Sequence, residues 1–309
     1  MEYLQQRRAE RARAQRRRRR LAGVGVLAVV VGVVALVLVA TSGGSPSATA
    51  AKAPQASTPV RHARTHKTVP RGSAQRAQLA AAAHFASYGL PLYCGGPSKH
   101  VVALTFDDGP GPYTTLAIKK LREAHLRATF FLVGKSIQAW PGLAVQEKAV
   151  AAVGDHTMTH PFLPGLPQSE MVQEIADART LIEHAAQQPV ALFRPPYGSR
   201  TPAIDAEAKA LGLVETLWTV DSRDSLGANY AGIEQNVIAG LHNGYIILMH
   251  ENRGQTIRAL PVIFAAIARE HFRTVTVPQL IAEDPPSLAQ LRAGGNGCGG
   301  GFHPGTGAS

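Results

Sequence analysis

From residue 101 onward, apolar strand-like runs alternate with helical patterns along the chain. Seven runs are typical of strands: 101–106, 128–133, 151–154, 190–193, 214–220, 245–249 and 273–277. Helical patterns lie between them, at 114–125, 137–149, 169–187, 202–211, 230–242 and 257–271. This alternation predicts a parallel α/β fold, as a barrel or as an open doubly wound sheet. In a barrel, functional groups gather at the carboxyl ends of the strands.

Polar residues do follow the predicted strands. Asp107 and Asp108 end the first run, and the next positions are Gly109 and Pro110. Such a sequence is also an ordinary turn. Paired carboxylates at the end of a buried strand are costly, however, unless a metal, an arginine or a substrate uses them. Other strand ends carry His156 and His160, Arg194, the segment 221–224, and His250.

These groups suggest metal-assisted hydrolysis. In a helical turn, the spacing of His156 and His160 would place both imidazoles on one side. Asp107 or Asp108 would complete a two-histidine, one-carboxylate site with open positions for water and substrate. The other aspartate would then take a proton from water.

Two further residues have a catalytic and a structural interpretation. Arg194 would keep the base ionised, or would be a surface arginine. His250, with Asp224 beside it, would protonate a leaving group, or would be a core-edge histidine bonded to the backbone.

The amino-terminal third has a different character. Residues 1–20 contain nine arginines, five of them consecutive, and residues 21–40 carry no charge. That length spans a bilayer, and the arginines predict a cytoplasmic tail (1–20) before a transmembrane signal-anchor (21–41). A cleaved signal peptide, with small residues at 48–50, is the alternative. The Ser-, Thr-, Ala- and Pro-rich segment 42–99 is predicted to be a disordered extracytoplasmic linker.

The formal net charge of +11 does not indicate nucleic-acid binding, because the excess lies in the first third. From residue 100 onward there are 16 basic and 19 acidic residues. We place the folded domain at 100–284 and a Gly-rich tail at 285–309. Outside the membrane, Cys94 and Cys298 would form a disulfide or remain free thiols. Two cysteines cannot build a cysteine-based zinc cluster.

The chain resembles the polysaccharide deacetylases of carbohydrate esterase family four. The similarity covers about residues 100–281 and rests on TFDDGP (105–110), HTMTH (156–160), RPPYG (194–198) and the run that leads into His250. The segment 128–134 also resembles the second strand of the family. The resemblance implies a distorted (β/α)7 barrel and a divalent metal, usually zinc, with cobalt, nickel or manganese as alternatives.

The resemblance also implies roles for single residues. Asp107 would be the general base, paired with Arg194, and Asp108, His156 and His160 would be the metal ligands. The backbone N–H of Tyr197 would stabilise the oxyanion. His250, tuned by Asp224, would be the general acid, and Leu248 would line the pocket for the acetyl methyl group.

The chain departs from the family pattern at three positions. Ser225 follows Asp224 where the family usually has tryptophan, and Trp218 is a candidate to supply the missing wall. Asp155 precedes the first ligand histidine in place of asparagine, which would add negative charge near the metal. Glu251 follows His250 where aspartate is usual.

We therefore expect a membrane-anchored, monomeric, metal-dependent enzyme that deacetylates N-acetylated sugars of an extracellular polymer, above all peptidoglycan or a chitin-like glycan. One alternative is an esterase that removes O-acetyl groups from xylan or another wall glycan. The other is a catalytically idle, sugar-binding wall protein.

Overall fold

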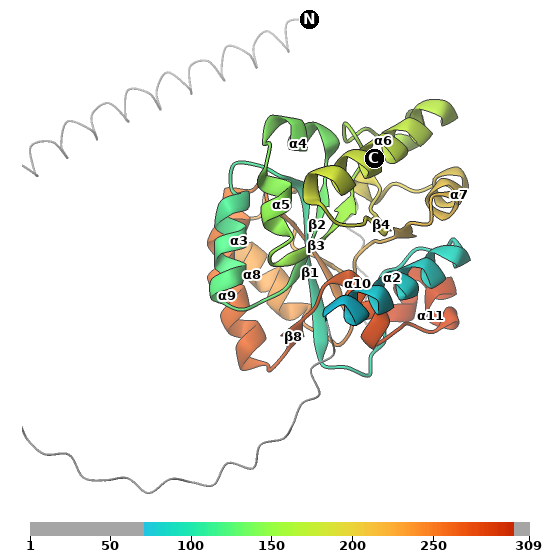
Figure 1. Cartoon of the computed structure of the whole chain (residues 1–309). Coiled ribbons are helices and arrows are strands. Elements are labelled where there is room, and N and C mark those ends of the chain that lie inside the picture. The colour runs from blue at the N-terminus through green and yellow to red at the C-terminus, as the bar shows by residue number, and fades with distance from the viewer. Residues whose placement is uncertain (1–70, 300–309) are drawn as a thin grey trace, which may run out of the picture. The chain divides into compact units, whose positions relative to one another are not determined.

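The computed structural model describes residues 71–299 (Figure 1). The predicted cytoplasmic tail (1–20), the signal-anchor (21–41) and the first part of the predicted linker (42–70) lie outside the described residues. Between residues 71 and 299, no helix combines the length and apolar character needed to cross a membrane. All described residues belong to one compact unit.

The unit is built on a parallel sheet, as the alternation predicts. Its neighbouring strands follow the order β5-β4-β3-β2-β1-β7-β6, and β8 pairs with the start of β1. All named strand pairs are parallel. The strands are β1 (Val101–Gly109), β2 (Ala128–Leu132), β3 (Ala151–Asp155), β4 (Leu192–Phe193), β5 (Val214–Glu215), β6 (Val220–Asp221), β7 (Ile246–His250) and β8 (Arg273–Thr274).

The predicted single strand 214–220 is wrong, because the structure splits it into β5 and β6 at opposite edges of the sheet. The chain crosses between the edges over residues 216–219. Two backbone carbonyls of this crossing, those of Thr216 and Leu217, accept hydrogen bonds from the side chain of Arg194 and not from a neighbouring strand. The sheet is therefore a parallel half-barrel, consistent with the distorted (β/α)7 barrel that the resemblance implies.

Helices cover the outer face of the sheet. They are α3 (Thr114–Glu123), α4 (Gly134–Ala139), α5 (Leu143–Glu147), α6 (Gln168–Ala186), α7 (Pro202–Ala210), α8 (Tyr230–Ala239) and α9 (Gly254–Arg269). The predicted helix 137–149 is two helices, because Pro141 keeps Trp140 out of the helical region and Gly142 has a φ of 81°. The other predicted helices on this face are confirmed within a few residues.

Alternation along the strands divides the apolar residues between two clusters. Val102, Leu104 and Phe106 of β1 pack with the outer helices. Val101 and Ala103 face the other way and pack with α2 (Arg71–Tyr88) and α10 (Val277–Glu283). In Figure 1, α2 and α10 lie side by side with α11 (Leu288–Ala293).

Helix α2 corrects the prediction of a disordered linker over 42–99, which is wrong for residues 71–99. Ala82, Phe85 and Ala86 of this helix are buried, and so is Leu92 beyond it. Alanine has the highest helix propensity, but an alanine-rich stretch shows little periodicity and resembles a low-complexity linker. The helix is stabilised by packing against the inner face of the sheet, and its own sequence pattern does not predict that packing.

The predicted Gly-rich tail, 285–309, is also folded in its first part. It forms α11 and the 3₁₀ turn η3 (Gly294–Cys298). Cys94 and Cys298 form a disulfide with their Cα atoms 6.0 Å apart, so the disulfide, and not the pair of free thiols, is what the structure shows. The bridge joins the end of the folded chain to the segment just before β1.

Candidate active site

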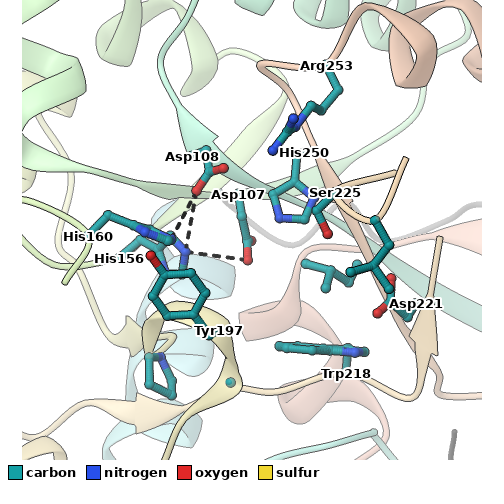
Figure 2. Close-up of a pocket in the computed structure, with 14 residues that line it drawn as sticks. Asp107, Asp108, His156, His160, Tyr197, Trp218, Asp221, Ser225, His250 and Arg253 are labelled. Atoms are coloured by element: carbon teal, nitrogen blue, oxygen red, sulfur yellow. Dashed lines mark ion pairs between the residues drawn. The ribbon is translucent and has the colours of Figure 1, made fainter. Parts of the chain in front are cut away.

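The carboxyl ends of the strands meet at a cavity of about 380 Å³ (Figure 2). The strand register brings the two proposed catalytic ends of β1 and β7 to the same position in the sheet, because Asp107 lies directly opposite His250. The lining residues are Asp107, Asp108, His156, His160, Pro195, Tyr197, Gly198, Trp218, Asp221, Ser225, Leu226, Leu248, His250 and Arg253. Arg194 and Asp224 lie behind this wall, where each contacts a lining residue.

Asp108, His156 and His160 come together as a candidate metal centre. One ligand atom from each lies within 4.8 Å of the others. Asp108 Oδ1 is 3.3 Å from His160 Nε2 and 3.8 Å from His156 Nε2. His156 Nδ1 is 2.6 Å from the carbonyl oxygen of Arg194, to which it donates when Nε2 is left as the ligand. Burial lowers the pKa of His156, which favours the neutral, ligating form.

The loop that carries the two histidines is not the helical turn that their spacing suggested. Thr157 and His160 have positive φ angles of 69° and 61°. The loop is held instead by Glu174 of α6, whose carboxylate accepts hydrogen bonds from Thr159 N–H at 2.8 Å and from Thr159 Oγ1 at 2.7 Å. The carbonyl of Glu174 accepts another from Met158 N–H. The sequence did not predict this role of Glu174, because the residue lies in a separate helix and in none of the motifs.

Asp155, the departure just before His156, is fully buried. Its Oδ1 accepts a hydrogen bond from Thr157 N–H at 2.8 Å. Burial raises the pKa of Asp155 well above its ordinary value. Burial thus opposes the negative charge that the sequence suggested at this position.

Arg194 is a buried partner of Asp107, not a surface arginine. Its Nη1 donates to Asp107 Oδ1 at 2.7 Å and to Thr105 Oγ1 at 2.8 Å. With the two bonds to the 216–219 crossing, the guanidinium makes four hydrogen bonds, and it lies 4.0 Å above the ring of Phe131. Removing either partner would leave an uncompensated buried charge, which costs about 3–5 kcal/mol. Asp107 Oδ2 is left on the side of His156, at 3.8 Å from Nε2.

His250 is paired with Asp224 as expected. Its Nδ1–H donates to Asp224 Oδ1 at 2.6 Å, and its backbone N–H donates to Oδ2 at 2.7 Å. Thr256 Oγ1 donates to the same Oδ2. Burial by itself would lower the pKa of His250, but the hydrogen bond and charge of Asp224, with the charges of Asp107 and Asp108, raise it to about 9. His250 is therefore an imidazolium at neutral pH.

The remaining predicted residues line the same cavity. Leu248 is buried at its wall, and Tyr197 is 59% exposed with its ring edge-on to His160. Trp218 lies in the cavity with Ser225, which supports its candidacy for the missing wall. A Cβ on Gly198, whose φ is 66°, would come within 2.8 Å of the Trp218 ring, so the glycine makes room for it.

Glu251 lies away from the cavity lining. It is fully buried, and Thr114 Oγ1 donates to it. Burial raises its pKa to about 8. Among the lining residues, Leu226 and Arg253 were not foreseen, because each lies outside the motifs.

A base held by a buried arginine, an acid held by a buried aspartate and a ligand cluster between them define a hydrolytic α/β-barrel enzyme. A model of the polysaccharide deacetylase family matches residues 95–216. The chain is 33% identical over 191 residues to a peptidoglycan-N-acetylglucosamine deacetylase of Bacillus cereus, covering 60% of this chain and 89% of that protein. The chain belongs to the polysaccharide deacetylase family.

Two further matches are a curated relative and a solved structure. A bifunctional xylanase/xylan deacetylase of Cellvibrio japonicus is 36% identical over 158 residues, which is 51% of this chain and 24% of that protein. A solved structure of a family 4 carbohydrate esterase from Streptomyces lividans, in complex with acetate, has a TM-score of 0.56 at 35% identity. It covers 60% of this chain and 95% of that one.

Proposed function

We propose that this protein is a metal-dependent hydrolase that removes the N-acetyl group from N-acetylglucosamine in peptidoglycan. The observation that carries the proposal is the position of Asp107 and His250, paired in register and both facing the Asp108–His156–His160 cluster. The reaction consumes one water and one amide and yields acetate and an amine. It therefore needs one group that accepts a proton and another that donates one.

The donor set of the cluster fits a divalent cation such as zinc, since it offers two imidazoles and one carboxylate with solvent access on one side. Bound there, such a cation would act as a Lewis acid toward the acetyl carbonyl and lower the pKa of water. Cobalt, nickel and manganese suit the same donors. Zinc is our first choice, because two histidines and a carboxylate form a common catalytic zinc set.

Different residues around the cluster accept and donate the protons of the reaction. Asp107, bonded to Arg194 through Oδ1, takes the proton of the attacking water through Oδ2. The backbone N–H of Tyr197 donates to the developing oxyanion. His250 gives its proton to the leaving nitrogen, and Asp224 keeps it charged until then. Leu248 and Trp218 bound the space for the acetyl methyl group and the sugar.

We further propose that the catalytic domain lies outside the cell membrane, anchored through residues 21–41. The Cys94–Cys298 disulfide supports this placement, because such bonds persist in oxidising compartments. The domain would begin at residue 71 and act as a monomer. Membrane fractionation and protease accessibility of whole cells test the placement; a catalytic domain protected from protease in intact cells would contradict it.

The test of function uses the full chain in detergent, with acetate release as the readout. We expect release from peptidoglycan and N-acetylchitooligosaccharides, loss of release in a chelator, and recovery when zinc is added back. Undiminished activity after complete removal of metal would contradict the mechanism. Glycan binding without any acetate release would favour the idle, sugar-binding alternative.

O-deacetylation is the second candidate, favoured by the 36% identity to the xylan deacetylase. The same base and acid would hydrolyse an acetate ester, since only the leaving atom differs. Acetylxylan included in the same assay separates the two functions. Faster release from acetylxylan than from N-acetylated glycans would favour the esterase.

A further inference from the structure

A second cavity neighbours the catalytic cavity, because the two share residues of the candidate metal centre. This second cavity also has a volume of about 380 Å³, and it shares Asp108 and His160 with the first. Its other lining residues are Val133, Lys135, Ser136, Ala139, Trp140, Thr159 and Asn252. We call the two cavities together the groove, since both contact Asp108 and His160 and a bound chain of several sugars would have lining residues of each within reach.

Each half of this groove carries one cationic side chain. Arg253 lines the catalytic cavity, and Lys135 lines the second one. Both are exposed. Over residues 71–299, neither side chain has a hydrogen bond or an ion pair with another residue. Figure 2 shows Arg253 beside His250, away from Asp221.

None of the nearby described carboxylates forms an ion pair with Arg253 or Lys135. Asp107 is bonded to Arg194, and Asp224 is bonded to His250. Asp108 belongs to the candidate metal centre. Asp221 also lines the catalytic cavity, and within residues 71–299 it accepts a hydrogen bond only from the backbone N–H of Arg223, but it lies away from Arg253. Among the described residues, the two cations of the groove therefore have no ion-pair partner, one in each cavity beside the candidate metal centre.

We propose that Arg253 and Lys135 bind carboxylates on the substrate, and that they select a carboxylated glycan over neutral acetylated glycans. The inference rests on the proposed deacetylase function and names the substrate class of that site. Guanidinium binds carboxylate through two parallel hydrogen bonds, and ammonium binds it as a point charge. A peptidoglycan strand carries such carboxylates, on lactyl groups or their peptides, on the sugars that neighbour each N-acetylglucosamine.

The test compares soluble peptidoglycan strands with the same strands after their carboxylates have been converted to neutral amides. The readout is the ratio of kcat/KM for acidic strands to kcat/KM for blocked strands, measured with the full chain in detergent. We expect Arg253→Gln to lower this ratio about tenfold, which corresponds to about 1.4 kcal/mol. Lys135→Gln should lower it by a smaller factor, and added salt should lower the wild-type ratio.

Two further variants separate recognition from folding. Arg253→Lys keeps the charge and should restore part of the ratio. Lys119→Gln is the matched control, because Lys119 is an exposed lysine on α3 that lines neither cavity. Its ratio should equal that of the wild type.

A ratio that stays the same in Arg253→Gln and Lys135→Gln would overturn the proposal, as would a wild-type enzyme that does not distinguish blocked from acidic strands. If the wild type releases no acetate from any strand, the proposed function fails separately. Binding of acidic and blocked strands to the wild type and to Arg253→Gln then decides the inference. Binding that is stronger for acidic strands and lost in the variant supports it, and equal binding refutes it.

Discussion

Replacing Asp224 by asparagine should move the pH dependence of the reaction by several pH units. In the wild type, Asp224 Oδ1 accepts from His250 Nδ1–H, while Oδ2 accepts from His250 N–H and from Thr256 Oγ1. An asparagine in the same position keeps its oxygen at the two donors on the Oδ2 side. Its NH₂ group then faces His250 Nδ1, and this donor has a hydrogen-bond acceptor there only if Nδ1 carries no proton. The substitution therefore favours neutral His250.

The size of the effect follows from the pKa of His250, which is raised from 6.5 to about 9 in the wild type. At about 1.4 kcal/mol per unit, this shift represents about 3 kcal/mol of stabilisation of the imidazolium. Without Asp224 the pKa should fall to about its ordinary value of 6.5, because burial then opposes only the charges of Asp107 and Asp108. The protonated fraction at pH 8 would drop about 30-fold, whereas at pH 6 it would change less than about twofold.

The raised pKa of His250 also makes the free energy of unfolding depend on pH. Because the folded-state pKa lies above the unfolded value, the contribution of the ion pair to the free energy of unfolding is complete below pH 6.5. It is lost as the pH rises through 9. Urea unfolding between pH 6 and pH 10 should show this loss in the wild type and not in Asp224→Asn.

The assay is the pH profile of kcat/KM for acetate release from an N-acetylchitooligosaccharide. The basic limb should lie near pH 9 in the wild type and near pH 6.5 in the variant. A cation at Asp108 offsets part of the field that raises the pKa of His250, so its titration should also be followed by NMR in metal-free protein. Asp221→Asn is the graded comparison, since Asp221 interacts with His250 through charge but makes no hydrogen bond to it, so the basic limb should move less than in Asp224→Asn. A basic limb that stays in place in Asp224→Asn would refute the assignment of His250 as the acid.

Three other predictions follow from the same contacts. Asp107→Asn should lower turnover by about 10²-fold or more and leave zinc affinity, measured by chelator competition, unchanged. Asp108→Ala should instead weaken zinc binding in the same measurement. Glu174→Ala should lower zinc affinity about 10- to 100-fold, because it removes the acceptors of both Thr159 hydrogen bonds and loosens the loop. Phe85→Ala should cost about 3–5 kcal/mol in urea unfolding, whereas an α2 that behaves as a free linker would show no change.

Local patterns accounted for much of the sheet and for the candidate catalytic residues. Strands such as β1 and β7 are continuous apolar runs that end at a polar residue, and this signal needs no tertiary information. The run 214–220 has the same apolar character but divides between two edges of the sheet. The segment between the two parts is held by Arg194 and by backbone bonds to Phe193, Leu92 and Ile246, contacts between residues more than twenty positions apart in the chain.

By itself, the sequence determined the parallel α/β class, the grouping of Asp107, Asp108, His156, His160, Arg194 and His250 at strand ends, and the family. These properties follow from alternation and from short ordered motifs. The tertiary structure alone decided that α2 covers the inner face of the sheet, that Glu174 holds the histidine loop, and that Arg253 and Lys135 flank the site. The physical reason is that each of these depends on contacts between distant segments, whose energies arise only once the chain has folded.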